Sequence, residues 1–236
     1  MPVYGLSEFE KDTLSIFRIL LDVCPSRKIE AVVFDIDGTL YRSESYEIHL
    51  RDEIYKLVAE VLGLELDKAV EKLESIKKVT RTVTLSIELM GIDRREFYDK
   101  LSRKVDPRSH IKPRPEVRKL LERLRKDKKL KIACHTNSGK LLLMKVLDAL
   151  GIPLEYFDVV VTSDTAPPKP LRDGYILLSK LLDTSFDKIM YVGDRWDVEV
   201  KVAKLLGMIT VMVYRREGNP DYYIEDVIEL EKILDP

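Results

Sequence analysis

The chain has 236 residues and nearly balanced charge, with 40 Lys and Arg against 41 Asp and Glu. This balance argues against broad nucleic-acid binding, which needs an excess of basic residues to neutralise phosphates. With 45% hydrophobic residues, the composition excludes a disordered chain, and the length predicts one or two domains. No apolar run reaches the ~18 residues of a membrane span, so we expect no membrane partner.

Composition also indicates where the protein works. The two cysteines, Cys24 and Cys134, exclude a disulfide framework, and the N-terminus lacks the basic and apolar regions of a signal peptide. We therefore expect a cytoplasmic protein. Abundant Lys, Glu and Arg, with two Asn and no Gln, resemble the composition of proteins from hyperthermophiles.

The first elements that we predict are an amphipathic helix over 6–23 and a short strand over 30–35, buried on both faces. From 44 to 111 the apolar periodicity is helical throughout. The helices expected in this stretch cover 46–63, 66–79, 82–91 and 95–105.

Beyond residue 111, short apolar runs alternate with helical segments. The expected strands cover 130–136, 158–162, 188–194 and 208–214. The expected helices cover 114–127, 138–150, 173–183, 197–206 and 222–234.

Strands that alternate with helices predict the α/β class, with a parallel sheet built from βαβ units. The helical stretch interrupts this pattern just after the first strand. We therefore predict an N-terminal helical extension over 1–29, an α/β core over 30–43 and 112–236, and a helical insertion over 44–111.

Two carboxylates, Asp35 and Asp37, end the first strand, and Gly38 follows them. In open α/β sheets, ligands bind at the carboxyl ends of the strands. One carboxylate can act there as a nucleophile while its neighbour works as an acid and base. Turn formation explains an Asp-x-Asp-Gly sequence as well, so both interpretations stay open.

Two further segments suit a phosphate group. Thr136 and Asn137 precede a helix that opens at Ser138, where hydroxyl and backbone N–H groups favour an anion. Lys169 lies between two prolines and supplies a positive charge. The alternatives are helix capping for the first segment and a solvated surface lysine for the second.

The last segment suits a metal ion. Asp194 ends the strand expected over 188–194, and a carboxylate there can ligate a hard cation such as Mg²⁺. A second acid follows it, and Asp197 and Glu199 are the two candidates for the acid that supports the metal site beside Asp194. Either acid is also typical of the first turn of a helix.

Taken in order, four segments resemble the four motifs of the haloacid dehalogenase superfamily. They are Asp-Ile-Asp-Gly-Thr-Leu at 35–40, Thr136, Lys169 and Gly-Asp at 193–194. The resemblance runs from about 30 to 214. It implies a Rossmann-like core in which the helical insertion forms a cap. The segment after the first motif is most similar to the pyrimidine 5′-nucleotidase-like and phosphoglycolate phosphatase-like branches.

The resemblance implies a Mg²⁺-dependent phosphatase that hydrolyses small phosphomonoesters, such as nucleotide or sugar phosphates, through an aspartyl-phosphate. Asp37 favours a phosphatase over a dehalogenase, because halide departure needs no acid. The implied catalytic residues are Asp35 as nucleophile, Asp37 as acid and base, and Thr136 and Lys169 at the phosphoryl oxygens. The implied metal ligands are Asp35, Asp37, Asp194 and, by spacing, Glu199. Alternatives are a phosphomutase and a non-catalytic binding protein.

Substrate contacts are expected from Thr136, Asn137 and Lys169, and also from residues of the cap and its linker. Arg42, Lys78 and Arg81 would meet a second anionic group, and Tyr41 would stack on a ring. Exposed basic residues on a charged face are the alternative. We expect a small phosphorylated metabolite as the partner, and a monomer or homodimer.

Overall fold

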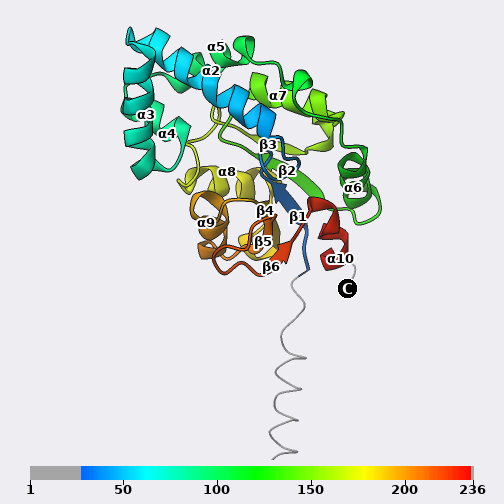
Figure 1. The fold of residues 1–236 in the computed structure, drawn as a ribbon. Coiled ribbons are helices and arrows are strands. Elements are labelled where there is room, and N and C mark those ends of the chain that lie inside the picture. Colours follow the sequence, from blue (N-terminus) through cyan, green and yellow to red (C-terminus); the bar gives the residue numbers. More distant parts are fainter. Residues whose placement is uncertain (1–27, 235–236) are drawn as a thin grey trace, which may run out of the picture.

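A computed structural model describes residues 28–234, so the helix predicted over 6–23 lies outside the described residues (Figure 1). Six strands form one sheet in the order β3-β2-β1-β4-β5-β6, and all neighbouring strands are parallel. The winding reverses at β1, which creates a crevice at the carboxyl ends of the central strands. The strands are β1 (Ala31–Phe34), β2 (Lys131–His135), β3 (Val159–Val161), β4 (Ile189–Gly193), β5 (Ile209–Val213) and β6 (Tyr222–Ile224).

Both faces of the sheet are covered, which explains why its strands are continuously apolar. Val32 and Phe34 of β1 belong to one apolar cluster, together with side chains of α6 (Pro115–Lys126) and α7 (Lys140–Leu150). Ala31 and Val33 face the opposite cluster, which α8 (Asp173–Leu182) and α9 (Lys201–Leu205) complete. The predicted α/β class with a parallel sheet is therefore confirmed.

Four α-helices fill the stretch between β1 and α6, and they lie above the sheet and to its left in Figure 1. Their apolar side chains form a cluster of their own around Leu57, Leu73 and Phe97, which Leu142 of α7 joins. This packing supports the proposal that residues 44–111 form a cap. The helices are α2 (Glu44–Leu62), α3 (Leu66–Thr80), α4 (Val83–Leu89) and α5 (Arg94–Lys104).

Ser43 links the start of this helical layer to its end. Its side chain accepts a hydrogen bond from the Tyr46 N–H, which caps α2, and its Oγ donates to the carbonyl oxygen of His110 at 2.7 Å. The segments that enter and leave the helical layer therefore lie side by side.

The helix predicted over 222–234 is wrong in its first half. Residues Tyr222–Ile224 form β6, which pairs in parallel with β5, and the α-helix α10 covers only Leu230–Leu234. Tyr and Ile favour strands, and the open edge of β5 supplies the backbone partners that make a strand here. Asp226 accepts from the Ile228 N–H and thereby starts the later helical turn.

Candidate active site

The predicted site residues from three strand ends meet in the crevice of the sheet. Phe34 of β1 is in register with Cys134 of β2 and with Val192 of β4. Asp35, which follows Phe34, donates its N–H to the Val192 carbonyl oxygen at 3.0 Å. Thr136 and Asp194 follow the neighbouring strands, so parallel pairing brings these side chains to one edge.

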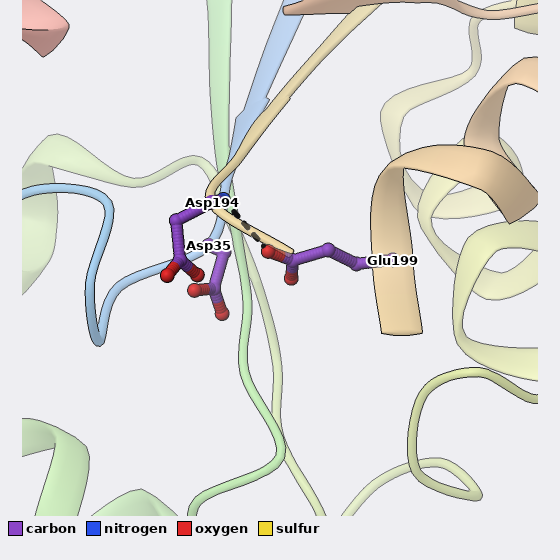
Figure 2. Close-up of side chains that lie close together, drawn as sticks. All are labelled: Asp35, Asp194 and Glu199. Atoms are coloured by element: carbon purple, nitrogen blue, oxygen red, sulfur yellow. Dashed lines mark hydrogen bonds between the residues drawn. The ribbon is translucent and has the colours of Figure 1, made fainter. Parts of the chain in front are cut away.

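Three carboxylates cluster at this edge. Asp35, Asp194 and Glu199 are buried and offer oxygens that all lie within 4.8 Å of one another. Figure 2 shows the first two carboxylates side by side, with Glu199 reaching them from the opposite side. Gly38 makes the approach of Asp194 feasible: it has φ +86°, and a Cβ there would lie 2.6 Å from Asp194 Oδ2.

The charges of this cluster are only partly balanced. Burial, and then the Glu199 carboxylate, raise the pKa of Asp35 to about 6 and that of Asp194 to about 8. Asp194 Oδ1 is buried and has no hydrogen-bond partner among the described residues. An unpartnered oxygen among like charges fits a divalent cation, because hard cations prefer carboxylate oxygens.

Lys169 lies against the same cluster and is only 2% exposed. Its Nζ donates to Asp35 Oδ1 at 2.6 Å, to the His135 carbonyl oxygen at 3.0 Å, and to Glu199 Oε2. Burial lowers the pKa of Lys169, but the Asp35 and Glu199 carboxylates outweigh it and hold this pKa above its ordinary value. The lysine therefore stays charged beside the nucleophile candidate, which excludes the alternative of a solvated surface lysine.

The structure separates the two rival acids. Glu199 Oε1 accepts the N–H groups of Asp194 at 2.9 Å and Arg195 at 3.1 Å, so this side chain fixes the loop that carries Asp194. Asp197 points away from the cluster, is 58% exposed and pairs with Arg81 at 3.3 Å. Asp197 and Glu199 lie two residues apart in the helical turn over Trp196–Val200, so their side chains fall on nearly opposite faces and Glu199 is the one that faces the cluster.

Asn137 interacts with the backbone of Lys169 through both ends of its amide. Its Oδ1 accepts from the Lys169 N–H at 2.7 Å, and its Nδ2 donates to the Lys169 carbonyl oxygen at 3.0 Å. Thr136 is buried beside it, and its Oγ1 accepts from the Ser138 N–H at 3.1 Å. Asn137 thus positions the lysine, a role that its spacing from Lys169 in the sequence does not reveal.

Asp37 has hydrogen-bond partners of its own. The Tyr41 hydroxyl donates to Asp37 Oδ1 at 2.5 Å, and the Ser138 hydroxyl approaches Oδ2 at 3.4 Å. Burial, and then the charge of Asp35, raise the pKa of Asp37 to about 6. A carboxyl group with such a pKa carries and releases a proton near neutral pH, as an acid–base catalyst must.

Three predicted substrate contacts have other partners in the structure. Tyr41 uses its hydroxyl on Asp37 and is buried instead of presenting its ring for stacking. The Arg42 guanidinium lies 5.1 Å from the ring centroid of Tyr214, outside the cavity lining. Arg81 pairs with Asp197, and its carbonyl oxygen accepts from Arg195 Nη2 at 2.7 Å. Tyr41, Arg42 and Arg81 are thus not among the residues that line the cavity in this structure.

A cavity of about 200 Å³ lies between the carboxylates and the helical layer. Asp35, Asp37, Thr136 and Lys169 line its polar side. The cavity lining also contains residues that the motifs did not indicate. Helical spacing alone groups some of them, such as Leu50 with Ile54 and Tyr98 with Leu101. These additional lining residues are Leu50, Ile54, Thr82, Val83, Thr84, Tyr98, Leu101, Arg195 and Val198.

Comparison with known proteins identifies the class that this fold and site define. The family model of haloacid dehalogenase-like hydrolases matches residues 29–207. The chain therefore belongs to this hydrolase family, as its motifs predicted.

Several relatives are similar over most of their length. A glyceraldehyde 3-phosphate phosphatase of Methanopyrus kandleri is 27% identical over 205 residues, which cover 79% of this chain and 84% of that protein. A Caldanaerobacter subterraneus protein proposed to be a pyrophosphatase is 28% identical, covering 88% and 95%. Among solved structures, a phosphatase of this family from Thermococcus onnurineus has a TM-score of 0.63 and 29% identity, covering 88% and 98%. None of the helices described for this chain has the length and apolar character of a membrane span.

Proposed function

We propose that the protein is a divalent-metal-dependent phosphatase that hydrolyses small phosphomonoesters through an aspartyl-phosphate on Asp35. The observation that carries this proposal is one cavity in which Asp35, Asp37 and Lys169 meet beside Asp194. The phosphatases among the relatives support it.

In the first step, a carboxylate oxygen of Asp35 forms a bond to phosphorus while the bond from phosphorus to the leaving oxygen breaks. Asp37 gives its proton to that oxygen, so the leaving group departs as an alcohol. In the second step, Asp37 takes a proton from a water molecule, whose oxygen attacks phosphorus. Asp35 is released as a carboxylate, and inorganic phosphate leaves.

We propose that Lys169 and Thr136 bind the phosphoryl oxygens during both steps. Lys169 already neutralises Asp35 and so reduces repulsion between this carboxylate and the phosphate. A divalent cation, for which we propose Mg²⁺, would be held by the carboxylates of Asp35 and Asp194 and by the backbone carbonyl oxygen of Asp37. When bound, this cation offsets the remaining negative charge of the carboxylates and the phosphate. Glu199 would keep Asp194 and Lys169 in place.

Metal affinity should depend on pH in a defined direction. Because the pKa of Asp194 is raised to about 8, the metal-free protein carries a proton there at pH 7, which a bound cation must displace. We expect the affinity for Mg²⁺ to rise about tenfold per pH unit from 6 to 8 and to level off above that range. Titration calorimetry in buffers of different ionisation enthalpy measures both the affinity and the released proton. Equal affinity at pH 6 and pH 8 would contradict this assignment.

The same group affects stability without metal. The pKa of Asp194 is 3.8 when unperturbed, so between about 4 and 8 the folded state holds a proton that the unfolded state has lost. The contribution of Asp194 to the free energy of unfolding therefore falls as pH rises through this window. Mg²⁺ should raise the melting temperature more at pH 8 than at pH 6, and Asp194→Asn should abolish this difference.

We propose that the substrate has a compact leaving group without a second negative charge. The wall opposite the carboxylates is formed largely by apolar side chains, and about 200 Å³ is below the roughly 300–1,000 Å³ of sites for drug-sized ligands. Lys169 and Arg195 are the cations among the described lining residues, and Lys169 is already neutralised by two carboxylates. An anionic leaving group would thus be desolvated with only Arg195, which the Arg81 carbonyl oxygen already holds, as a counter-charge in the lining.

This preference can be measured with matched phosphate esters. We expect kcat/KM for glycerol phosphate to exceed that for 3-phosphoglycerate by about tenfold or more, which corresponds to about 1.4 kcal/mol. Phosphate release is measured with Mg²⁺ and with EDTA. Val83→Lys places a cation in the apolar wall and should lower the ratio of kcat/KM for glycerol phosphate to kcat/KM for 3-phosphoglycerate. Isomerised phosphate esters in place of free phosphate would indicate the phosphomutase alternative.

A further inference from the structure

Two neighbouring buried tyrosines differ in what their hydroxyls do. Tyr41 and Tyr46 are 3% and 1% exposed, and their ring centroids lie 6.3 Å apart. The Tyr41 hydroxyl donates to Asp37 Oδ1 at 2.5 Å, whereas the Tyr46 hydroxyl is buried without a hydrogen-bond partner among the described residues. A tyrosine can therefore be buried here without a hydrogen bond from its hydroxyl. The hydrogen bond from Tyr41 to Asp37 thus needs another explanation than burial.

The segment that carries Tyr41 is firmly held. Asp37 and Tyr41 form an isolated backbone bridge, and Arg114 Nη1 donates to the Leu40 carbonyl oxygen at 3.1 Å. Arg114 is in turn paired with Asp226 at 2.9 Å. The tyrosine hydroxyl is thus presented to Asp37 from a fixed position.

This contact distinguishes the two oxygens of Asp37. The single hydroxyl proton of Tyr41 points at Oδ1, so Oδ1 serves as an acceptor. Oδ2 has only the distant Ser138 hydroxyl, at 3.4 Å, and stays available for a proton that can be given away. A carboxyl group free to rotate would present either oxygen and would be misaligned much of the time, and misplacement by about 1 Å costs about 10²-fold in rate.

We propose that Tyr41 is a positioning residue that holds Asp37 Oδ1, so that Oδ2 delivers the proton to the leaving oxygen. This inference rests on the proposed phosphatase function and adds to it the residue that orients the acid. The proton moves from Oδ2 to the leaving oxygen as the bond to phosphorus breaks. Tyr41 keeps its own proton throughout and touches no reacting atom.

The test compares Tyr41→Phe with Tyr46→Phe on two esters. p-Nitrophenyl phosphate has a good leaving group that needs little protonation, whereas glycerol phosphate has a poor one that needs a well-placed acid. We expect Tyr41→Phe to lower kcat/KM, which reports the steps up to formation of the aspartyl-phosphate, about 10- to 100-fold for glycerol phosphate and less than about threefold for p-nitrophenyl phosphate. Tyr46→Phe removes a hydroxyl that has no partner and should leave both rates unchanged.

Asp37→Asn provides the reference, because it removes the acid and should show a larger dependence on the leaving group. Equal losses on both esters in Tyr41→Phe, or no loss on either, would overturn the positioning role while Asp37→Asn still supports the mechanism. If the wild-type protein releases no phosphate from either ester, the proposed function fails and this inference fails with it.

A second substitution keeps the test decisive if Tyr41→Phe folds poorly. 4-Aminophenylalanine at position 41 retains the ring and an N–H donor toward Asp37. We expect it to restore at least about a third of the wild-type rate on glycerol phosphate. If the protein with 4-aminophenylalanine at position 41 folds as the wild type does but is as slow on glycerol phosphate as Tyr41→Phe, the proposal is contradicted.

Discussion

Asp35→Asn should lower phosphate release by about 10⁴-fold or more, because an amide cannot form the phosphorylated intermediate. The loss is expected in kcat, and Mg²⁺ should not restore it. Release is measured on p-nitrophenyl phosphate with purified wild type and variant. A covalent phosphate on Asp35, trapped by acid quench and found by mass spectrometry, should disappear in the variant.

The same change should leave the fold intact. Burial and Glu199 raise the pKa of Asp35 above its unperturbed value despite the neighbouring Lys169, so the charged form is disfavoured in the folded protein. An amide removes that charge and still offers an oxygen to Lys169. Urea unfolding should therefore give a midpoint close to that of the wild type.

Asp197→Asn is the matched control, since this acid is close in sequence to the cluster but exposed outside it. It should retain more than about half of the wild-type activity, as is usual for changes at exposed sites. Phosphate release that survives in Asp35→Asn would place the nucleophile elsewhere.

The sheet and the position of the site were predictable because the signals for both are local. Three of the four motifs directly follow a short apolar run, and parallel pairing brings the ends of such runs together without further information. Asp35, Thr136 and Asp194 meet for this reason. β6 was missed because the residues Tyr222–Ile224 become a strand only beside the edge of β5, which is a tertiary contact.

The assignment of individual partners needed coordinates. Motif spacing favoured Glu199 over Asp197, but the contacts of Glu199 with Lys169 and with the backbone of Asp194 and Arg195 needed the structure. Arg42 and Arg81 were placed near a substrate by charge alone, yet each has a protein partner supplied by a distant segment. Long side chains reach across several ångströms, so their contacts follow from tertiary packing and not from spacing in the sequence.

Lys169→Met should be the most damaging single change for stability, because it leaves Asp35 and Glu199 without their buried counter-charge. We expect the free energy of unfolding to fall by about 3–5 kcal/mol in EDTA. Activity should fall by about 10³-fold, since the charge that stabilises the transferring group is lost. Urea unfolding with and without Mg²⁺ measures the first effect, and Mg²⁺ should recover part of the lost stability.

Lys169→Arg separates charge from geometry. The ammonium group has three donors, and it meets three acceptors here: Asp35 Oδ1, Glu199 Oε2 and the carbonyl oxygen of His135. A planar guanidinium keeps the charge but cannot reproduce this arrangement. We therefore expect Lys169→Arg to regain part of the stability that Lys169→Met loses while remaining at least about 10²-fold less active than the wild type. Full activity in Lys169→Arg would mean that positive charge alone suffices and that the three fixed contacts of the lysine are not needed.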